Sequence, residues 1–207
     1  MATFYIHSYL CHKLFEKNVI PDEFKAIFHL GCFAPDLPAH TVTKKKTHYV
    51  HGLSSYPLIY NIKRFKKENY YNSEIDETQK WFLKGYLYHL FIDSVWWKFY
   101  GQKFMNRNFY KLNREKKKYY NGMSKIDKYI RHHNGKNKFE DLSLKLFQDI
   151  DFPMEQKLLD IKKLIEIIEC MEFSKYESAE IIDRKLIFIK DDFLKTINDH
   201  EMMILTL

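Results

Sequence analysis

The sequence predicts an all-α protein, a single-domain helical bundle of about seven or eight helices that spans residues 1–207. Glycine (6) and proline (5) are scarce in the 207 residues, whereas sheet-rich folds use both in their many tight turns. Apolar side chains recur at helical spacing along most of the chain. These observations argue against a β-sandwich or barrel. The lack of a glycine-rich phosphate loop argues against Rossmann and P-loop domains.

The predicted helices begin near the N-terminus with residues 3–17, where apolar side chains recur at helical spacing. Pro21, followed by two acidic residues, marks the start of a second helix, because proline and acids favour the first turn. Gly31 is predicted to end this helix. Residues 32–52 are predicted to form a long irregular loop, and residues 54–67 a short amphipathic helix.

The middle of the chain carries the most apolar segment, residues 74–101, which is apolar on nearly every side and is therefore expected in the centre of the bundle. Residues 106–132 form a basic helix in this interpretation. Three further amphipathic helices follow, over residues 139–148, 155–173 and 176–205. The C-terminal helices of residues 139–207 are predicted to act as scaffold, because their sequence contains few polar clusters.

The charge is distributed unevenly along the chain, whose net charge is +7. Residues 61–138 hold 19 basic and 7 acidic residues, whereas residues 139–207 hold 9 and 16. The run Lys111–Lys118, which tyrosines flank, could meet nucleic acid or a phospholipid surface. The alternative is an ordinary solvated helix face.

The cellular setting is predicted from what the sequence contains and lacks. Three widely spaced cysteines, Cys11, Cys32 and Cys170, form no CxxC pair, which is typical of a reducing compartment. No apolar run reaches the roughly 20 residues of a membrane span, and the first residues do not resemble a signal peptide. We therefore expect a cytoplasmic protein without a transmembrane segment.

Candidate ligands for a divalent metal lie at four separate places within residues 1–100. His89 and Asp93, four residues apart, share one face of the most apolar helix. A carboxylate buried there needs either a cation or a network of protein groups to neutralise it. Asp36 lies between two prolines, His48 ends the basic loop, and His7 lies in the first helix. Taken one at a time, each is more often an ordinary turn, cap, surface or core residue. Together they supply the nitrogen and oxygen ligands typical of zinc, iron or manganese.

The order of these residues is similar to that of the zinc-dependent phospholipase C family and the related single-strand nucleases. The resemblance covers roughly the first half of the chain, and its specificity comes from the ordered combination of four short motifs. These motifs are His7-Ser-Tyr-Leu, Leu30-Gly-Cys-Phe-Ala-Pro-Asp36, Lys46-Thr-His48-Tyr and Gly85-Tyr-Leu-Tyr-His89-Leu-Phe-Ile-Asp93. The resemblance implies an all-α, phospholipase C-like fold, in agreement with the helical periodicity.

The resemblance also implies a ligand set. Asp36, His48, His89 and Asp93 would hold one metal ion, and Asp93 would bridge to a second ion held by His7. The implied cofactor is zinc, as one or two ions, with iron or manganese as alternatives. Asp36 would also orient or deprotonate the attacking water.

Two departures from the family pattern limit what the resemblance implies. The secreted members begin at a tryptophan whose free amino group binds metal, whereas this sequence begins with methionine. The family also uses a later histidine and an HxxxE pair for a third ion. None of His132, His133 and His200 has a glutamate four residues on. One or two ions are therefore expected. His12 is an alternative to His7, and His51 an alternative to His48.

The function predicted from these residues is that of a metal-dependent hydrolase that cleaves a phosphate ester by metal-bound hydroxide. Lys46, Tyr49 and Trp97 are the candidate substrate-binding residues. The expected partner is an anionic small molecule or a phospholipid. Two alternatives stay open: a non-catalytic or accessory helical protein with one metal, and a basic helical protein that binds nucleic acid or a membrane surface.

Overall fold

The computed structural model describes residues 2–37, 44–51, 59–60, 75–104, 113–134 and 184–206, together with Phe65 and Glu68. Five long helices make up most of this part: α1 (Phe4–Glu16), α2 (Asp22–Phe33), α5 (Glu77–Trp96), α7 (Asn113–Asn134) and α9 (Arg184–Leu205). Short elements join them: the 3₁₀ turn η1 (Ala34–Asp36), α3 (Lys44–Thr47), the π-helical turn η2 (Trp97–Gly101) and α6 (Gln102–Phe104). The predicted all-α class is confirmed. The helices predicted over residues 139–148 and 155–173 lie outside the described residues.

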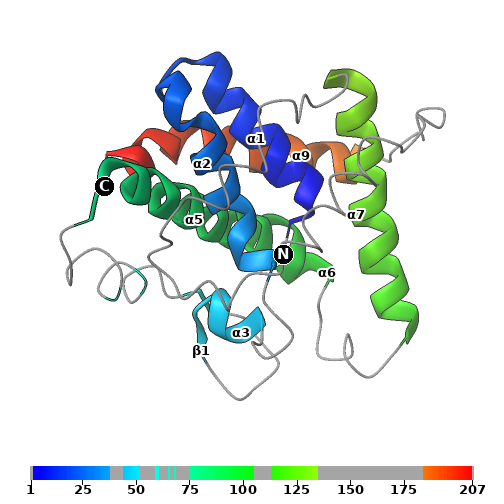
Figure 1. The fold of residues 1–207 in the computed structure, drawn as a ribbon. Helices are drawn as coiled ribbons and strands as arrows, with labels where there is room; N and C mark the ends of the chain where they lie inside the picture. The colour runs from blue at the N-terminus through cyan, green and yellow to red at the C-terminus, as the bar shows by residue number, and fades with distance from the viewer. Residues whose placement is uncertain are drawn as a thin grey trace.

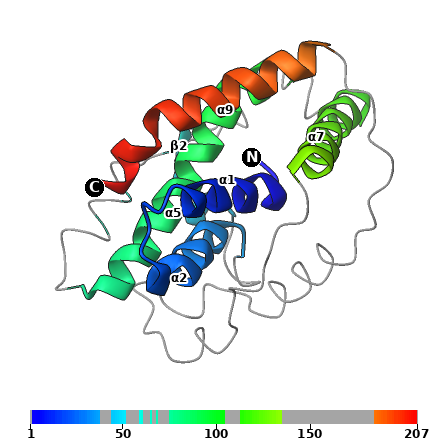
Figure 2. The same ribbon diagram turned by 90° about the horizontal axis from the view of Figure 1, so that it is seen from above.

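α5 is the central helix, as the apolar run predicts. It begins at a capping box, in which Asp76 accepts a hydrogen bond from the Gln79 amide and the Gln79 side chain accepts one from the Asp76 amide. From Phe82 to Trp96 nearly every side chain is buried. α2 packs along α5 on one side, and α9 runs beside it on another (Figures 1 and 2). The helix most apolar in sequence is therefore the one with neighbours all around it.

Two glycines let α2 and α5 approach closely. A Cβ atom at Gly31 would lie 2.0 Å from the Phe82 carbonyl oxygen, and one at Gly85 would lie 2.0 Å from the Phe28 carbonyl oxygen. The prediction that Gly31 ends the second helix is wrong, because α2 continues to Phe33. Gly31 is needed for this packing contact, in which only a residue without a side chain fits.

α1 and α7 meet at the start of α1. Thr3 caps α1 by accepting a hydrogen bond from the Ile6 amide, 3.2 Å away. The Thr3 hydroxyl also donates a hydrogen bond to Asp127 of α7. This contact ties a helix from the basic middle of the chain to the N-terminal end of the molecule.

α9 packs along α5 through a stripe of buried side chains four residues apart. Phe193 lies edge-on to Trp96, with ring centroids 5.2 Å apart. Ile197, Glu201 and Leu205 continue the stripe. The buried Glu201 carboxylate pairs with Lys17, just after α1. The C-terminal helix predicted within residues 176–205 is therefore confirmed from Arg184 onward.

A short hairpin interrupts the helical pattern. β1 (Val50–His51) pairs antiparallel with β2 (Ile59–Tyr60), with Val50 opposite Tyr60. Residues 59–60 lie in the stretch predicted as a helix, so that prediction is wrong at these two positions. β-branched and aromatic residues favour paired strands, and pairing with β1 outweighs the weak helical pattern. Among the helices described, none is long and apolar enough to cross a membrane.

Candidate metal centre

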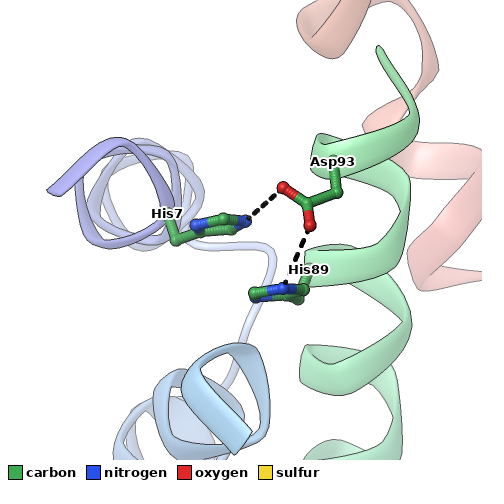
Figure 3. Close-up of side chains that lie close together, drawn as sticks. All are labelled: His7, His89 and Asp93. Atoms are coloured by element: carbon green, nitrogen blue, oxygen red, sulfur yellow. Dashed lines mark ion pairs between the residues drawn. The ribbon is translucent and has the colours of Figure 1, made fainter. Parts of the chain in front are cut away.

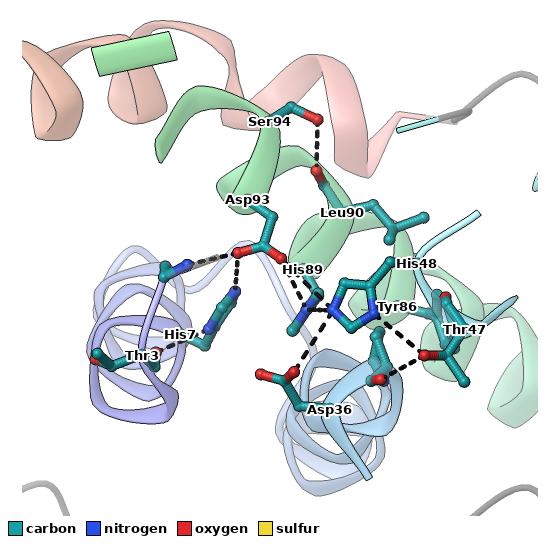
Figure 4. Close-up of polar contacts among 12 residues, drawn as sticks. Thr3, His7, Asp36, Thr47, His48, Tyr86, His89, Leu90, Asp93 and Ser94 are labelled. Carbon is teal, nitrogen blue, oxygen red and sulfur yellow. Dashed lines mark hydrogen bonds and ion pairs between the residues drawn. The ribbon is translucent and has the colours of Figure 1, made fainter. Parts of the chain in front are cut away.

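Five side chains from four segments converge beside α5 (Figure 4). His89 and Asp93 come from α5, His7 from α1, Asp36 from η1, and His48 from the turn that follows α3. All five are almost completely buried, with between 0% and 3% of each residue exposed. The structure thus brings together every residue of the predicted ligand set.

One half of the cluster joins α1 to α5 (Figure 3). His7 Nε2 lies 3.6 Å from Asp93 Oδ1, and His89 Nε2 lies 3.5 Å from Asp93 Oδ2. The two imidazole rings stack with centroids 4.0 Å apart and an interplanar angle of 5°. The backbone amide of Ala2 also donates to Asp93 Oδ1 at 2.7 Å. Both oxygens of this carboxylate therefore face the cluster.

The other half joins η1 and the turn after α3 to α5. His48 Nε2 lies 3.5 Å from Asp36 Oδ1 and 3.6 Å from Asp93 Oδ2. It also lies 3.1 Å from His89 Nε2. Two groups of three residues could thus each hold an ion, His7 with His89 and Asp93, and Asp36 with His48 and His89.

The hydrogen bonds at Nδ1 fix the tautomer of each histidine. His7 Nδ1 donates to the Thr3 carbonyl at 2.8 Å, and His89 Nδ1 donates to the Cys32 carbonyl at 2.7 Å. The Thr47 hydroxyl gives its one proton to the Pro35 carbonyl at 2.7 Å. It must therefore accept from His48 Nδ1, 3.1 Å away. Every Nδ1 carries a proton, so in the neutral rings every Nε2 presents a lone pair.

These tautomers leave the centre of the cluster rich in acceptors. The Nε2 atoms of His48 and His89 face each other at 3.1 Å with no proton from either neutral ring between them. His7 Nε2 and Asp93 Oδ2 are buried and have no hydrogen-bond partner among the described residues. Facing lone pairs and a buried carboxylate require a cation, which is either an extra proton or a metal ion. The donor set is the nitrogen and oxygen mix that zinc accepts.

The electrostatic environment favours neutral imidazole at His7 and ionised carboxylate at Asp93. Burial, with the neighbouring His89, lowers the pKa of His7 to about 3. Burial alone would raise the pKa of Asp93. The N-terminal ammonium, His89 and His7 together hold it well below its ordinary value. For His89, burial acts to lower the pKa, but the Asp93 carboxylate outweighs it and the pKa is raised. Asp93 is therefore the charge around which the cluster is organised.

Three other predicted site residues, His12, His51 and Lys46, belong to neither three-residue group. His12 packs edge-on against His29 and Phe15 rather than in either three-residue group. His51 belongs to β1. Lys46 is exposed one residue before Thr47.

The two aromatic candidates for substrate binding are held by packing. The Tyr49 ring lies edge-on to Phe65, with centroids 5.3 Å apart. Trp97 is 6% exposed and follows Asp93 by four residues, so it continues the face of α5 that carries His89 and Asp93.

Two side chains that position the ligands, Thr47 and Tyr86, are not among the predicted site residues. Thr47 accepts from His48 Nδ1 and donates to the Pro35 carbonyl, beside Asp36. The Tyr86 hydroxyl of α5 donates to the Thr47 carbonyl. Outer partners of this kind fix the orientation of metal-ligating histidines. The only signal in the sequence is position, since Thr47 directly precedes a histidine and Tyr86 precedes His89 by three residues.

The helical scaffold and the buried histidine–aspartate cluster define the class: a helical protein with a candidate metal centre. The chain belongs to the zinc dependent phospholipase C family, whose sequence model matches residues 4–177. The match includes all five cluster residues and extends well beyond the first half of the chain, in which the four motifs lie. No curated protein and no solved structure matches the chain significantly. Membership of a zinc-dependent family agrees with the nitrogen and oxygen donors of the cluster.

Proposed function

We propose that this protein is a metal-dependent hydrolase of phosphate esters, with zinc as its metal and a phospholipid or a smaller anionic phosphodiester as its substrate. The observation that carries the proposal is the pair of Nε2 atoms 3.1 Å apart on His48 and His89, each with its Nδ1 proton already committed. Family membership supports the choice of zinc and of a phosphate ester.

The ligands follow from the two groups of converging donors. One group is Asp36, His48 and His89, and the other is His7, His89 and Asp93. Because Asp93 Oδ2 also lies 3.6 Å from His48 Nε2, Asp36, His48, His89 and Asp93 would hold one ion, and His7 with Asp93 would hold a second. The same donors would accept iron or manganese. When bound, such an ion lowers the pKa of water from near 16 to about 7 and offsets charge on a phosphoryl oxygen.

The protein's own groups supply the remaining chemistry. We assign to Asp36 the role of holding and accepting the proton of the attacking water, because its carboxylate lies at the edge of the cluster beside His48. The exposed Lys46 would attract the anionic substrate toward the turn that carries His48. Tyr49 and Trp97 are proposed to line the substrate's path.

The test measures metal content and turnover on the same preparation. The full chain, reconstituted with zinc, is expected to retain at least one equivalent by elemental analysis and to hydrolyse the soluble lipid dihexanoylphosphatidylcholine. Asp36→Asn keeps the size of the side chain but removes the base, so hydrolysis should fall about 100-fold or more. Five converging ligands in the folded protein should bind metal stoichiometrically. A folded chain that binds less than about a tenth of an equivalent of zinc, iron or manganese would therefore contradict the proposal.

A second candidate function is that of an accessory protein with a structural metal. The burial of the cluster favours this alternative, since His7, His89 and Asp93 are 0% exposed and a structural site is closed to solvent. The same experiment separates the two functions. Stoichiometric zinc without hydrolysis of any phosphodiester would identify the accessory protein.

A further inference from the structure

α7 has a buried face and an outer face of opposite character. Tyr119, Ile126 and Ile130 are at most 2% exposed and point into the protein. The Tyr119 carbonyl accepts a hydrogen bond from the Tyr100 hydroxyl at 2.6 Å. These contacts fix which side of α7 is turned outward, and Figure 2 shows the helix at the edge of the described part of the molecule.

The outer face carries a line of cations, which we call the basic ridge: Arg114, Lys117, Lys118, Lys125 and Lys128. Spacings of three, four, eleven and fourteen residues from Arg114 place them on one side of the helix, opposite the buried stripe. The ridge extends over about 21 Å at the helical rise. The side chains of Arg114 and Lys118 are 77% and 59% exposed.

Neither acidic residue of α7 lies on the ridge. Glu115 is only 14% exposed and pairs from the flank with Arg114 at 3.5 Å and Lys118 at 3.1 Å. Asp127 accepts the hydrogen bond from Thr3 of the neighbouring helix. Along the sequence, residues 94–126 contain nine basic residues and Glu115 as the one acidic residue. Cations therefore outnumber anions along the ridge, although Arg114 and Lys118 share Glu115 as a partner.

The ridge is tied to the candidate metal centre through two hydrogen bonds. Asp127 accepts from the Thr3 hydroxyl, and the Thr3 carbonyl accepts from His7 Nδ1. The helix that carries the ridge thus contacts the same residue that orients a candidate ligand. Tyr120, 56% exposed, flanks the ridge with an aromatic ring that has an apolar body and a polar tip.

We propose that the basic ridge docks the protein on anionic phospholipid headgroups, so that α7 holds the candidate metal centre beside a lipid surface. Lysines and arginines close to such a surface are attracted to its negative potential, and tyrosine is favoured at the boundary between headgroups and acyl chains. This docking proposal rests on the proposed phosphate-ester hydrolase function in one respect only, the choice of a phospholipid rather than another polyanion as the partner.

The test is cosedimentation with vesicles of phosphatidylcholine containing about a third phosphatidylserine, compared with pure phosphatidylcholine. Wild-type protein should prefer the anionic vesicles, and the preference should weaken as salt rises. Each charge close to the surface contributes about fivefold in affinity, so the triple variant Arg114→Gln, Lys117→Gln, Lys118→Gln should bind about a hundredfold more weakly. The matched control neutralises Lys13, Lys80 and Lys195, three lysines on other helices, and changes the net charge equally.

Two results would overturn the proposal. One is equal loss of binding in the ridge variant and the control, which would mean that only net charge matters. The other is tighter, ridge-dependent binding of a 20-nucleotide uridine oligomer than of vesicles at the same salt, which would make the ridge a nucleic-acid surface. Zinc content and hydrolysis of soluble dihexanoylphosphatidylcholine should be unchanged in the ridge variant. If the wild-type protein hydrolyses no phosphodiester, the proposed function is wrong, but the vesicle-binding measurement still tests the docking proposal.

Discussion

α1 and α2 contribute histidines to two groups of side chains that differ in what surrounds them. His12 and His29 lie among aromatic rings, with His29 4.6 Å from the Phe33 ring and 3.1 Å from the Ser8 hydroxyl. His7, by contrast, stacks on His89 and faces Asp93. Of the described residues, only the second group belongs to a set of converging ligands.

The difference between the groups shows what turns a buried histidine into a candidate ligand. His29 directs Nε2 at a hydroxyl, which is a neutral partner. His7 uses Nδ1 on a carbonyl and leaves Nε2 toward a carboxylate. A lone pair facing an anion is unfavourable without a cation, whereas a ring against a hydroxyl and aromatic edges needs none. His29 and His7 are both buried, so burial alone does not identify the site.

The strongest test of the comparison removes one histidine from each group. His89→Ala should weaken zinc binding by at least about a hundredfold, because His89 belongs to both three-residue groups and outer partners alone are worth about 10–100-fold. His29→Ala should keep the zinc and lose stability instead. Zinc affinity measured by competition with a chelator, beside urea unfolding, checks both outcomes. If both variants lost zinc equally, the two groups of histidines would not differ in metal binding, and the comparison would be wrong.

A substitution at Gly31 should damage both groups together, because Gly31 lies between His29 and Cys32, whose carbonyl orients His89. The new Cβ would meet the Phe82 carbonyl oxygen at 2.0 Å and force α2 away from α5. We expect Gly31→Ala to lower the free energy of unfolding by about 3 kcal/mol and to weaken zinc binding. Ser124→Ala, at an exposed position of α7, is the control and should change stability by about 0.5 kcal/mol or less.

Thr47 should matter to the candidate ligands alone. Thr47→Val keeps the branched shape but removes the hydroxyl that accepts from His48 and donates to the Pro35 carbonyl. Zinc affinity should fall about tenfold. Thr47→Ser restores the hydroxyl and should restore binding, and the visible spectrum of the cobalt-substituted protein should follow the same pattern. An unchanged spectrum and affinity in Thr47→Val would remove this residue from the site.

The smallest expected effect is a pH dependence that comes from the aromatic group. Burial, followed by the charge of His12, lowers the pKa of His29 well below its ordinary value of 6.5. Below pH 6.5 the unfolded chain therefore binds a proton at this residue that the folded chain does not, and stability falls as the pH falls. His29→Leu should therefore reduce the loss of stability between pH 7 and pH 5. Urea unfolding at pH 7 and pH 5 measures this change in the free energy of unfolding. An equal change in the wild-type and His29→Leu proteins would contradict the lowered pKa of His29.

Much of the fold and the members of the candidate site could be predicted from local pattern. The apolar run of α5 predicts a central helix, and the four-residue spacing of His89 and Asp93 places both on one face. The choice between His7 and His12 could not be made in this way. α1 is buried on several sides, so its periodicity does not show which side meets α5.

Other features depend on contacts between segments that are distant in sequence. Gly31 resembles a helix end until the backbone of α5 is placed beside it. The pairing of β1 with β2 likewise depends on a partner strand rather than on the periodicity of residues 59–60. Thr47 acquires its role only when the Pro35 carbonyl and the Tyr86 hydroxyl reach it.

The position of Asp93 between the two halves of the cluster has a consequence for how the centre would fill. Its Oδ1 faces His7 and its Oδ2 faces His48 and His89, so one carboxylate serves both halves. With Asp36 it supplies two negative charges, which neutralise one divalent ion. A second ion would leave the centre with a surplus of two positive charges in a medium that stabilises charge poorly. The doubly filled centre would therefore draw in anions, and a phosphodiester would supply one of the two negative charges needed.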